Sequence, residues 1–213
     1  MALEPPTSAT DGRRVRHEHR RRQILEAVAD HLSERGLEDL RSLGAGAGVS
    51  HRTLLYHFGS RDRLLRESLT VVRDREQARV ARIADAIDSS EGELDAAQVL
   101  RAAWAGLSAP ERIALTRLHF QVQGAALSSD EPAFDRFLDD LVHSWIELLR
   151  RLVVRSGVPE RDGHAVATYV YAGIRGLMLD LISTGDRERI GAGFEQLVIA
   201  TLSLLPRAAR RRA

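Results

Sequence analysis

The segment 48–60 constrains the fold of this chain more than any other part of the sequence. Gly48 can adopt the positive φ of a tight turn, and the side-chain oxygen of Ser50 can cap the N-terminus of a helix. At helical periodicity the apolar residues that follow share one face, namely Leu54, Leu55 and Phe58. A short helix that follows a glycine-containing turn and has an opposite polar face is typical of the recognition helix in a helix-turn-helix.

The polar face of this helix carries side chains that suit the major groove of DNA. Arg52 can bridge O6 and N7 of guanine, and Thr53 can offer its hydroxyl to a base or its methyl group to thymine. We therefore predict that these two residues contact base edges. Phosphate oxygens are the predicted partners of the other polar side chains, which are Ser50, His51, Tyr56 and His57. Arg61 begins the next predicted helix, where free backbone N–H groups also favour a phosphate.

Residues 13–22 form the most basic segment, with six arginines and two histidines against one glutamate. Residues 1–66 carry 12 arginines against 9 acidic residues, although the net charge of the chain is only +1. The chain has no lysine, and arginine favours bidentate contacts with phosphate and guanine. Next to a helix-turn-helix, this asymmetry predicts an arm on the DNA backbone or minor groove, formed by Arg13, Arg14, Arg16 and Arg20.

Apolar residues recur at helical spacing along the chain, and no segment shows the sustained two-residue alternation of a strand. Proline, glycine and serine mark the breaks between the helical segments, and Asp39 is the expected N-cap of the second helix. We therefore predict an all-α protein. The expected helices are 18–35, 40–47, 50–57, 60–88, 94–107, 110–127, 131–155, 159–184 and 188–205.

Residues 19–66 resemble the N-terminal DNA-binding domain of TetR-family transcriptional regulators. The resemblance rests on Leu-Ser-Glu-Arg-Gly at 32–36, Leu-Gly at 43–44, Ala-Gly-Val-Ser at 47–50, and Phe-Gly-Ser-Arg-Asp followed by two leucines at 58–65. It implies a three-helix DNA-binding domain and, beyond it, a helical domain that binds an effector and forms a homodimer through its last two helices. Two positions differ from the family pattern: Leu55 stands where tyrosine is common, with Tyr56 following it, and Arg61 replaces a lysine.

Composition and the resemblance together divide the chain into four parts. We expect a disordered tail at 1–12, a helix-turn-helix domain with its basic arm at 13–66, a helical effector-binding and dimerisation domain at 67–205, and a basic tail at 206–213. Candidates for the effector pocket are Trp104, His119, Phe120, Trp145, Tyr171 and Arg175, from four predicted helices. Each aromatic side chain taken singly also suits an ordinary core, and the polar groups at 171 and 175 also suit a dimer interface or the surface.

The sequence argues against an enzyme, a cofactor and a metal site. The glycines at 44–48 lack the preceding strand and the third-glycine spacing of a dinucleotide-binding turn. The histidine pairs at 17 and 19 and at 51 and 57 do not place both rings on one helical face, and there is no cysteine. No signal-peptide pattern opens the chain, and the apolar run at 165–182 is interrupted by tyrosine, arginine and aspartate, so we expect a cytoplasmic protein that does not enter a membrane.

These observations predict a transcriptional regulator that binds double-stranded DNA as a homodimer at a near-palindromic operator. The resemblance favours a repressor that an unknown small-molecule effector releases, although repressors and activators share this DNA-binding machinery. The alternative is an all-helical scaffold that binds another protein and does not recognise DNA sequence. The outward arginine, threonine, tyrosine and histidine at 50–57 favour the first hypothesis.

Overall fold

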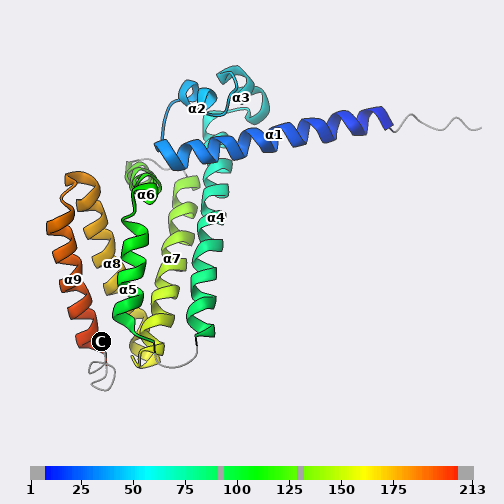
Figure 1. Cartoon of the computed structure of the whole chain (residues 1–213). Helices are drawn as coiled ribbons and strands as arrows, with labels where there is room; N and C mark the ends of the chain where they lie inside the picture. Colours follow the sequence, from blue (N-terminus) through cyan, green and yellow to red (C-terminus); the bar gives the residue numbers. More distant parts are fainter. Residues whose placement is uncertain (1–7, 91–93, 129–131, 206–213) are drawn as a thin grey trace, which may run out of the picture. The chain divides into compact units, whose positions relative to one another are not determined.

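The computed structural model of the chain describes residues 8–90, 94–128 and 132–205, and every regular element in them is a helix (Figure 1). The helices are α1 (Ser8–Arg35), α2 (Leu40–Gly46), α3 (His51–Phe58), α4 (Arg61–Ser89), α5 (Ala96–Leu107), α6 (Pro110–Ser128), α7 (Pro132–Arg155), α8 (Glu160–Thr184) and α9 (Arg187–Leu204). The all-α prediction is therefore confirmed for the described residues. The chain forms two compact units that divide between Val72 and Arg73, within α4. The boundary expected after residue 66 also falls within this helix.

The start of α1 differs from the prediction. The helix begins at Ser8, whereas we expected a disordered tail over 1–12 and a helix only from about residue 18. The basic segment continues the helix because arginine is a good helix former, and Arg14 Nε donates to Glu18 Oε1 at 3.2 Å, one helical turn away. The predicted arm is thus part of α1. Residues 1–7 of the predicted N-terminal tail and the predicted tail at 206–213 lie outside the described residues.

The first unit buries one apolar stripe from each of its four helices. The fully or almost fully buried side chains are Ile24, Val28 and Leu32 of α1, Leu43 of α2, Leu54 and Phe58 of α3, and Leu64, Leu65, Leu69 and Val72 of α4. Leu55, which we expected to dock with its two apolar neighbours on α3, is instead 37% exposed. Leu54 and Phe58 lie one helical turn apart on the same stripe, and Leu55 is rotated by about 100° from Leu54.

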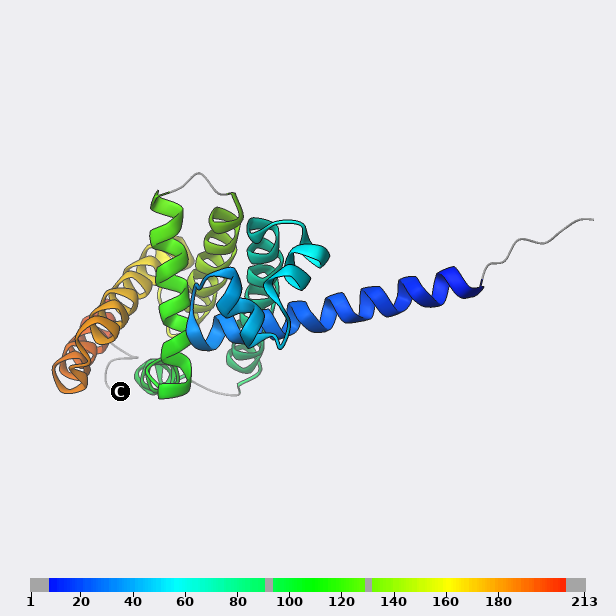
Figure 2. The same ribbon diagram turned by 90° about the horizontal axis from the view of Figure 1, so that it is seen from above.

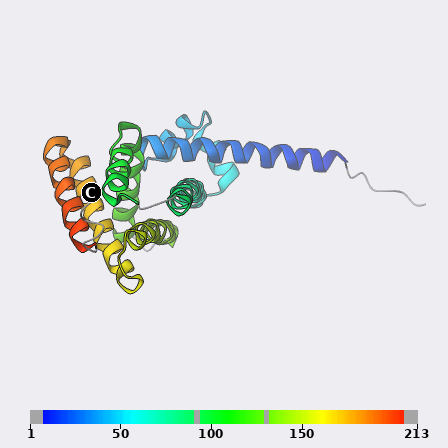
Figure 3. The ribbon, with the colours of Figure 1, turned by 60° about the horizontal axis from the view of Figure 1, so that its bottom comes forward.

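The second unit is a bundle built from α5 to α9 together with the C-terminal part of α4. In it α8 packs against α7 and α9, and α8 and α9 form a helical hairpin, which Figures 2 and 3 show from two further directions. Gly185, with φ of 71°, ends α8, and the Asp186 carboxylate accepts a hydrogen bond from the backbone N–H of Arg189 at 3.1 Å to begin α9. By length and hydropathy α8 also meets the requirements of a membrane span, but here it is a helix of the bundle.

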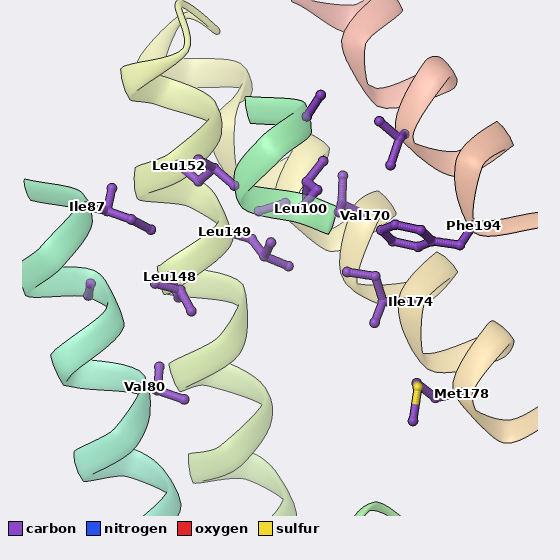
Figure 4. Close-up of a cluster of buried hydrophobic side chains, with 14 of the residues drawn as sticks. Val80, Ile87, Leu100, Leu148, Leu149, Leu152, Val170, Ile174, Met178 and Phe194 are labelled. Atoms are coloured by element: carbon purple, nitrogen blue, oxygen red, sulfur yellow. The ribbon is translucent and has the colours of Figure 1, made fainter. Parts of the chain in front are cut away.

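The core of this bundle draws apolar side chains from five helices (Figure 4). It contains Val80 and Ile87 of α4, Leu100 of α5, Leu148, Leu149 and Leu152 of α7, Val170, Ile174 and Met178 of α8, and Phe194 of α9. The Trp104 ring stacks on Phe194, with 4.6 Å between the ring centroids and 11° between the planes. Burial of these side chains from water is the main force that holds the bundle together.

Candidate DNA interface and effector cavity

The helix-turn-helix is fixed by hydrogen bonds at the start of each helix. The Asp39 carboxylate accepts from the backbone N–H groups of Arg41 and Ser42, both at 2.9 Å, and so caps α2 as expected. The Ser50 hydroxyl accepts from the N–H of Thr53 at 3.1 Å and caps α3. Gly48 has φ of 66°, as the turn required. Local capping and one left-handed glycine thus set the direction in which α3 leaves the turn.

The turn also packs closely on α2, at Gly44. The N–H of Val49 donates to the carbonyl oxygen of Gly44 at 2.9 Å, and a Cβ on Gly44 would come within 2.8 Å of the Val49 carbonyl oxygen. Because that obstacle is backbone, the chain could relieve the clash only by moving the turn. The glycine that weakens α2 in isolation therefore permits the close approach of the recognition helix.

Gly44→Ala is expected to lower the free energy of unfolding by about 1–2 kcal/mol, because the overpacked turn must shift. Gly106→Ala is the matched control, since a Cβ on Gly106 in α5 would meet nothing within 4 Å. That change should raise the free energy of unfolding by about 0.5–1 kcal/mol through helix propensity. Urea denaturation of both variants measures the difference, and equal stabilisation by the two alanines would contradict the close packing at Gly44.

The solvent-facing side of α3 displays the residues that we predicted to contact DNA. His51 and Arg52 are exposed, and Tyr56 is 76% exposed. Arg52 makes no hydrogen bond or ion pair with any described residue, so its guanidinium is available to an external partner. Thr53 is half-buried, and its hydroxyl lies 2.9 Å from the Ser50 hydroxyl, so these two side chains are already engaged with each other.

His57 is more enclosed than its neighbours on α3. Its ring centroid lies 4.8 Å from that of His17 in α1, and the Tyr56 ring lies 5.9 Å from the same histidine. Burial, followed by the positive charges of His17, Arg20 and Arg21, lowers the pKa of His57. Its ring is therefore neutral at pH 7 in the absence of DNA.

The basic segment of α1 combines exposed charges with one structural arginine. Arg16 and Arg20 are exposed, Arg14 pairs with Glu18, and the side chain of Arg13 lies outside the described residues. Arg21, in contrast, joins three helices: it donates to both Glu67 carboxylate oxygens of α4 at 2.6 and 2.5 Å and to the His57 carbonyl of α3 at 3.3 Å. Its guanidinium also lies 4.6 Å from the centre of the Phe58 ring. This residue holds the end of the recognition helix.

Arg61 also has a partner within the domain. Its guanidinium donates to the carbonyl oxygen of Glu38, before α2, at 3.2 Å. The side chain is exposed, so its remaining N–H groups stay accessible to a phosphate. Arg61 thus ties the start of α4 to the loop before α2 while it presents charge to solvent.

The second unit contains a cavity of about 120 Å³, large enough for a small organic ligand. Five of the six predicted pocket residues line it: His119, Phe120, Trp145, Tyr171 and Arg175. The sixth, Trp104, does not, because its side chain points to Phe194 of α9 and belongs to the core. Most of the wall is apolar and comes from α4, α5, α7 and α8.

One part of the cavity wall is charged, and the sequence analysis missed it. Glu76 of α4 is only 3% exposed and accepts hydrogen bonds from Arg79 and, at 2.8 and 2.9 Å, from Arg112 of α6. Burial alone would raise the pKa of Glu76, but the hydrogen bonds from both guanidinium groups lower it below its ordinary value. A signal was present in the sequence, because Glu76 follows Val72 by one helical turn and so continues the inward stripe of α4.

Two further polar groups complete this wall. His119 Nε2 is buried and has no hydrogen-bond partner within the described part of the chain. Burial lowers the pKa of His119 to about 4, so its imidazole is neutral at pH 7. Arg175 donates to the amide oxygen of Gln123 and lies 5.6 and 5.4 Å from the ring centres of Phe120 and Tyr171. Within the described residues, no group of three or more histidine, aspartate or glutamate side chains could hold a metal ion.

Comparison with known families and structures agrees with the helix-turn-helix and with the all-helical fold. The family model described as bacterial regulatory proteins, tetR family, matches residues 24–68, which run from α1 to the start of α4. No curated protein matches the chain. A transcriptional regulator from Rhodococcus sp. Rha1 is 22% identical with a TM-score of 0.67, and the match covers 86% of this chain and 96% of that chain.

Two further structures have the same fold and more specific descriptions. The multidrug binding protein EbrR, in complex with proflavin, is 22% identical with a TM-score of 0.60, covering 84% of this chain and 98% of that chain. NalD of Pseudomonas aeruginosa, the secondary repressor of the MexAB-OprM multidrug efflux pump, is 19% identical with a TM-score of 0.55, covering 90% of this chain and 98% of that chain. At these identities the likeness shows a shared fold.

Proposed function

We propose that the chain is a TetR-family regulator, a DNA-binding protein without enzymatic activity, and that it acts as a ligand-responsive repressor; residues 24–68 match the family model, and solved regulators share the fold. The proposal is carried by the outward face of α3, where Arg52 is exposed and has no partner among the described residues; this helix is held by its N-cap and by Arg21. Such a face can enter the major groove and hydrogen bond with base edges. A repressor must reach DNA, so the proposed compartment is the cytoplasm.

We propose a homodimer that places one α3 helix in each of two successive major grooves of a near-palindromic operator. The simplest spacing of the half-sites is about 34–36 Å, one turn of DNA. Exposed large apolar side chains on the last two helices support an interface there: Tyr169 and Leu179 of α8, and Ile199 and Leu204 of α9. Ala172 and Gly176 lie between the first two on α8 and are also exposed, so a partner helix could approach closely.

Leu179→Arg is expected to convert the dimer to a monomer, because it buries an unpaired charge within the proposed apolar interface. Since a monomer keeps only half of the DNA contacts, operator affinity should fall about 100-fold or more. Light scattering coupled to size-exclusion chromatography measures the mass. The matched control is Leu127→Arg, at a leucine of α6 that is 83% exposed. A Leu179→Arg protein that stays dimeric would rule out this interface.

The proposed switch couples the cavity to DNA binding through α4. This helix belongs to the DNA-binding unit up to Val72, and its next turns supply Glu76, Arg79, Ile83 and Ile87 to the cavity wall. An effector in the cavity would favour a conformation of the dimer with the wrong separation of the α3 helices. It can change DNA affinity only by its differential affinity for the two conformations, about 1–3 kcal/mol in typical cases. The ligand bound to EbrR and the repressor role of NalD, both of the same fold, support this assignment.

Arg52→Ala is expected to weaken operator binding by about 1–3 kcal/mol and to relax the preference at one base position of each half-site. Binding-site selection from a random duplex library, with wild-type and variant proteins in parallel, measures both effects. Arg16→Ala, in the exposed basic segment of α1, is the control: it should weaken all duplexes to a similar extent and lower the salt dependence. A uniform loss for Arg52→Ala as well would make Arg52 a phosphate contact.

A further inference from the structure

The charges in the cavity wall do not balance. Three arginines line the cavity, whereas Glu76 is the only acidic residue in the described wall. Arg79 and Arg112 share this carboxylate, with the closest N–O distances at 2.8 Å for each. Arg175 has no acidic partner among the described residues. The polar side of the cavity therefore carries an excess of two positive charges.

Arg175 is held in place at the cavity wall by two aromatic rings and one amide. Its guanidinium is fixed between the Phe120 and Tyr171 rings and by its hydrogen bond to Gln123. A half-buried guanidinium in an apolar wall loses hydration, and an anion would replace it with short, charge-assisted hydrogen bonds. The planar fork of arginine matches the two oxygens of a carboxylate.

His119 supplies a second polar group on the same wall. Its buried Nε2 lacks a partner within the described residues, and such atoms are rare in proteins unless something binds them. In the tautomer that carries hydrogen on Nε2, the ring can donate to an anionic oxygen. Because His119 is neutral at pH 7, the excess positive charge comes from the arginines.

The remainder of the cavity would accept only an apolar body. Its wall includes Ile83, Leu100, Leu141, Trp145, Leu148 and Met178, from α4, α5, α7 and α8. A ligand buried there gains from removal of its apolar surface from water. An ammonium group would meet like charges at the arginines, and a neutral amide would leave their charge uncompensated.

We propose that the effector is an apolar monoanion, an alkyl or aromatic carboxylate whose anionic group binds Arg175 and His119 and whose body fills the apolar part of the cavity. The proposal rests on the ligand-responsive function above and specifies its ligand class. It implies that, among ligands with the same apolar part, the affinity of the protein for the ligand depends on the charge of the polar group.

The test compares octanoate, octanamide and octylammonium, which share a chain length and differ in charge. In a Trp104→Phe background, Trp145 in the cavity wall is the only tryptophan of the chain, and its fluorescence reports binding without DNA. Calorimetric titration of naphthalene-2-carboxylate and its carboxamide extends the comparison to an aromatic body. For the octyl or the naphthalene pair, whichever binds more tightly, the carboxylate should bind about 10-fold or more tightly than its amide. Octylammonium should bind more weakly than octanamide.

Variants then show which residue causes the preference for a carboxylate over an amide. Arg175→Gln should reduce carboxylate affinity about 10- to 100-fold and remove the preference over the amide, and Arg175→Lys should restore part of it. Arg117→Gln, at an exposed arginine of α6, changes the net charge equally and should have no effect. Equal or tighter binding of the amide or amine, or no saturable binding of either carboxylate, would overturn the proposal. The charge series with Arg175 unchanged decides this even if an Arg175 variant fails to fold. A neutral or cationic compound that releases operator DNA would overturn the ligand class but leave the proposed repressor function intact.

Discussion

Replacing Glu76 with glutamine is expected to lower the free energy of unfolding by about 3–5 kcal/mol. Glu76 is 3% exposed, and its single carboxylate accepts hydrogen bonds from Arg79 and Arg112, which come from two different helices. Glutamine keeps the shape but removes the charge, so two guanidinium groups would remain in the wall of an apolar cavity without compensation. Chemical denaturation followed by circular dichroism measures the loss.

An exposed ion pair supplies the control for this prediction. Glu195 pairs with Arg101 at 2.9 Å, but both side chains are almost half exposed, so water screens the interaction. Glu195→Gln should therefore change the free energy of unfolding far less than Glu76→Gln does. If Glu76→Gln cost no more than this control, Glu76 would not hold the two arginines as described.

The second large effect is a loss of folding stability at acidic pH. The folded protein is expected to lose up to about 3 kcal/mol of stability through His119 between pH 6.5 and pH 4. Its pKa falls from the ordinary 6.5 to about 4 in the folded state, because burial disfavours the charged ring. The charge of Glu76 opposes this shift, and the charges of Arg112, Arg175 and Arg79 add to it.

The sign follows from which state binds the proton. Between pH 6.5 and pH 4 the unfolded chain protonates His119 and the folded protein does not, so stability falls as the pH falls. Below about pH 4 both states carry the proton and the contribution is exhausted. Thermal unfolding of the wild-type protein and His119→Gln across this pH range measures the contribution of His119. Other groups that titrate in this range contribute equally to both proteins, so they cancel in the comparison. Parallel pH profiles would show that His119 titrates normally.

Much of the helical organisation followed from the sequence because its breaks are strong. Pairs and clusters of serine, glycine and proline separate α5 to α9, and the predicted ends of these helices lie within two residues of those in the structure. The capped turn at 47–50 was equally clear, since Gly48 and Ser50 act through local backbone chemistry. The start of α1 was missed because, among the described residues, no apolar side chain of the core precedes Ile24; helix propensity and the Arg14–Glu18 pair carry the helix back to Ser8.

The errors at the candidate sites have a common origin in helix rotation and long-range pairing. Trp104 was placed in the pocket, but Leu100, Ala103 and Leu107 of α5 line the cavity, and the tryptophan turns toward α9. Arg21 was counted only as part of the basic segment 13–22, although it pairs with Glu67, which is distant in sequence. Charged residues usually face solvent, so the sequence pattern alone does not distinguish this half-buried ion pair from an exposed basic face.

The central claim, sequence-specific DNA binding by α3, is tested most directly by fluorescence anisotropy with the duplex that flanks the gene for this chain. A shuffled duplex of the same composition is the control, at about 0.15 M salt, where non-specific binding is weak. We predict tight binding to the native duplex alone and loss of that preference in Arg52→Ala. Equal, weak binding to both duplexes, with no sequence enriched from a random library, would contradict the account and favour a helical scaffold that binds another protein.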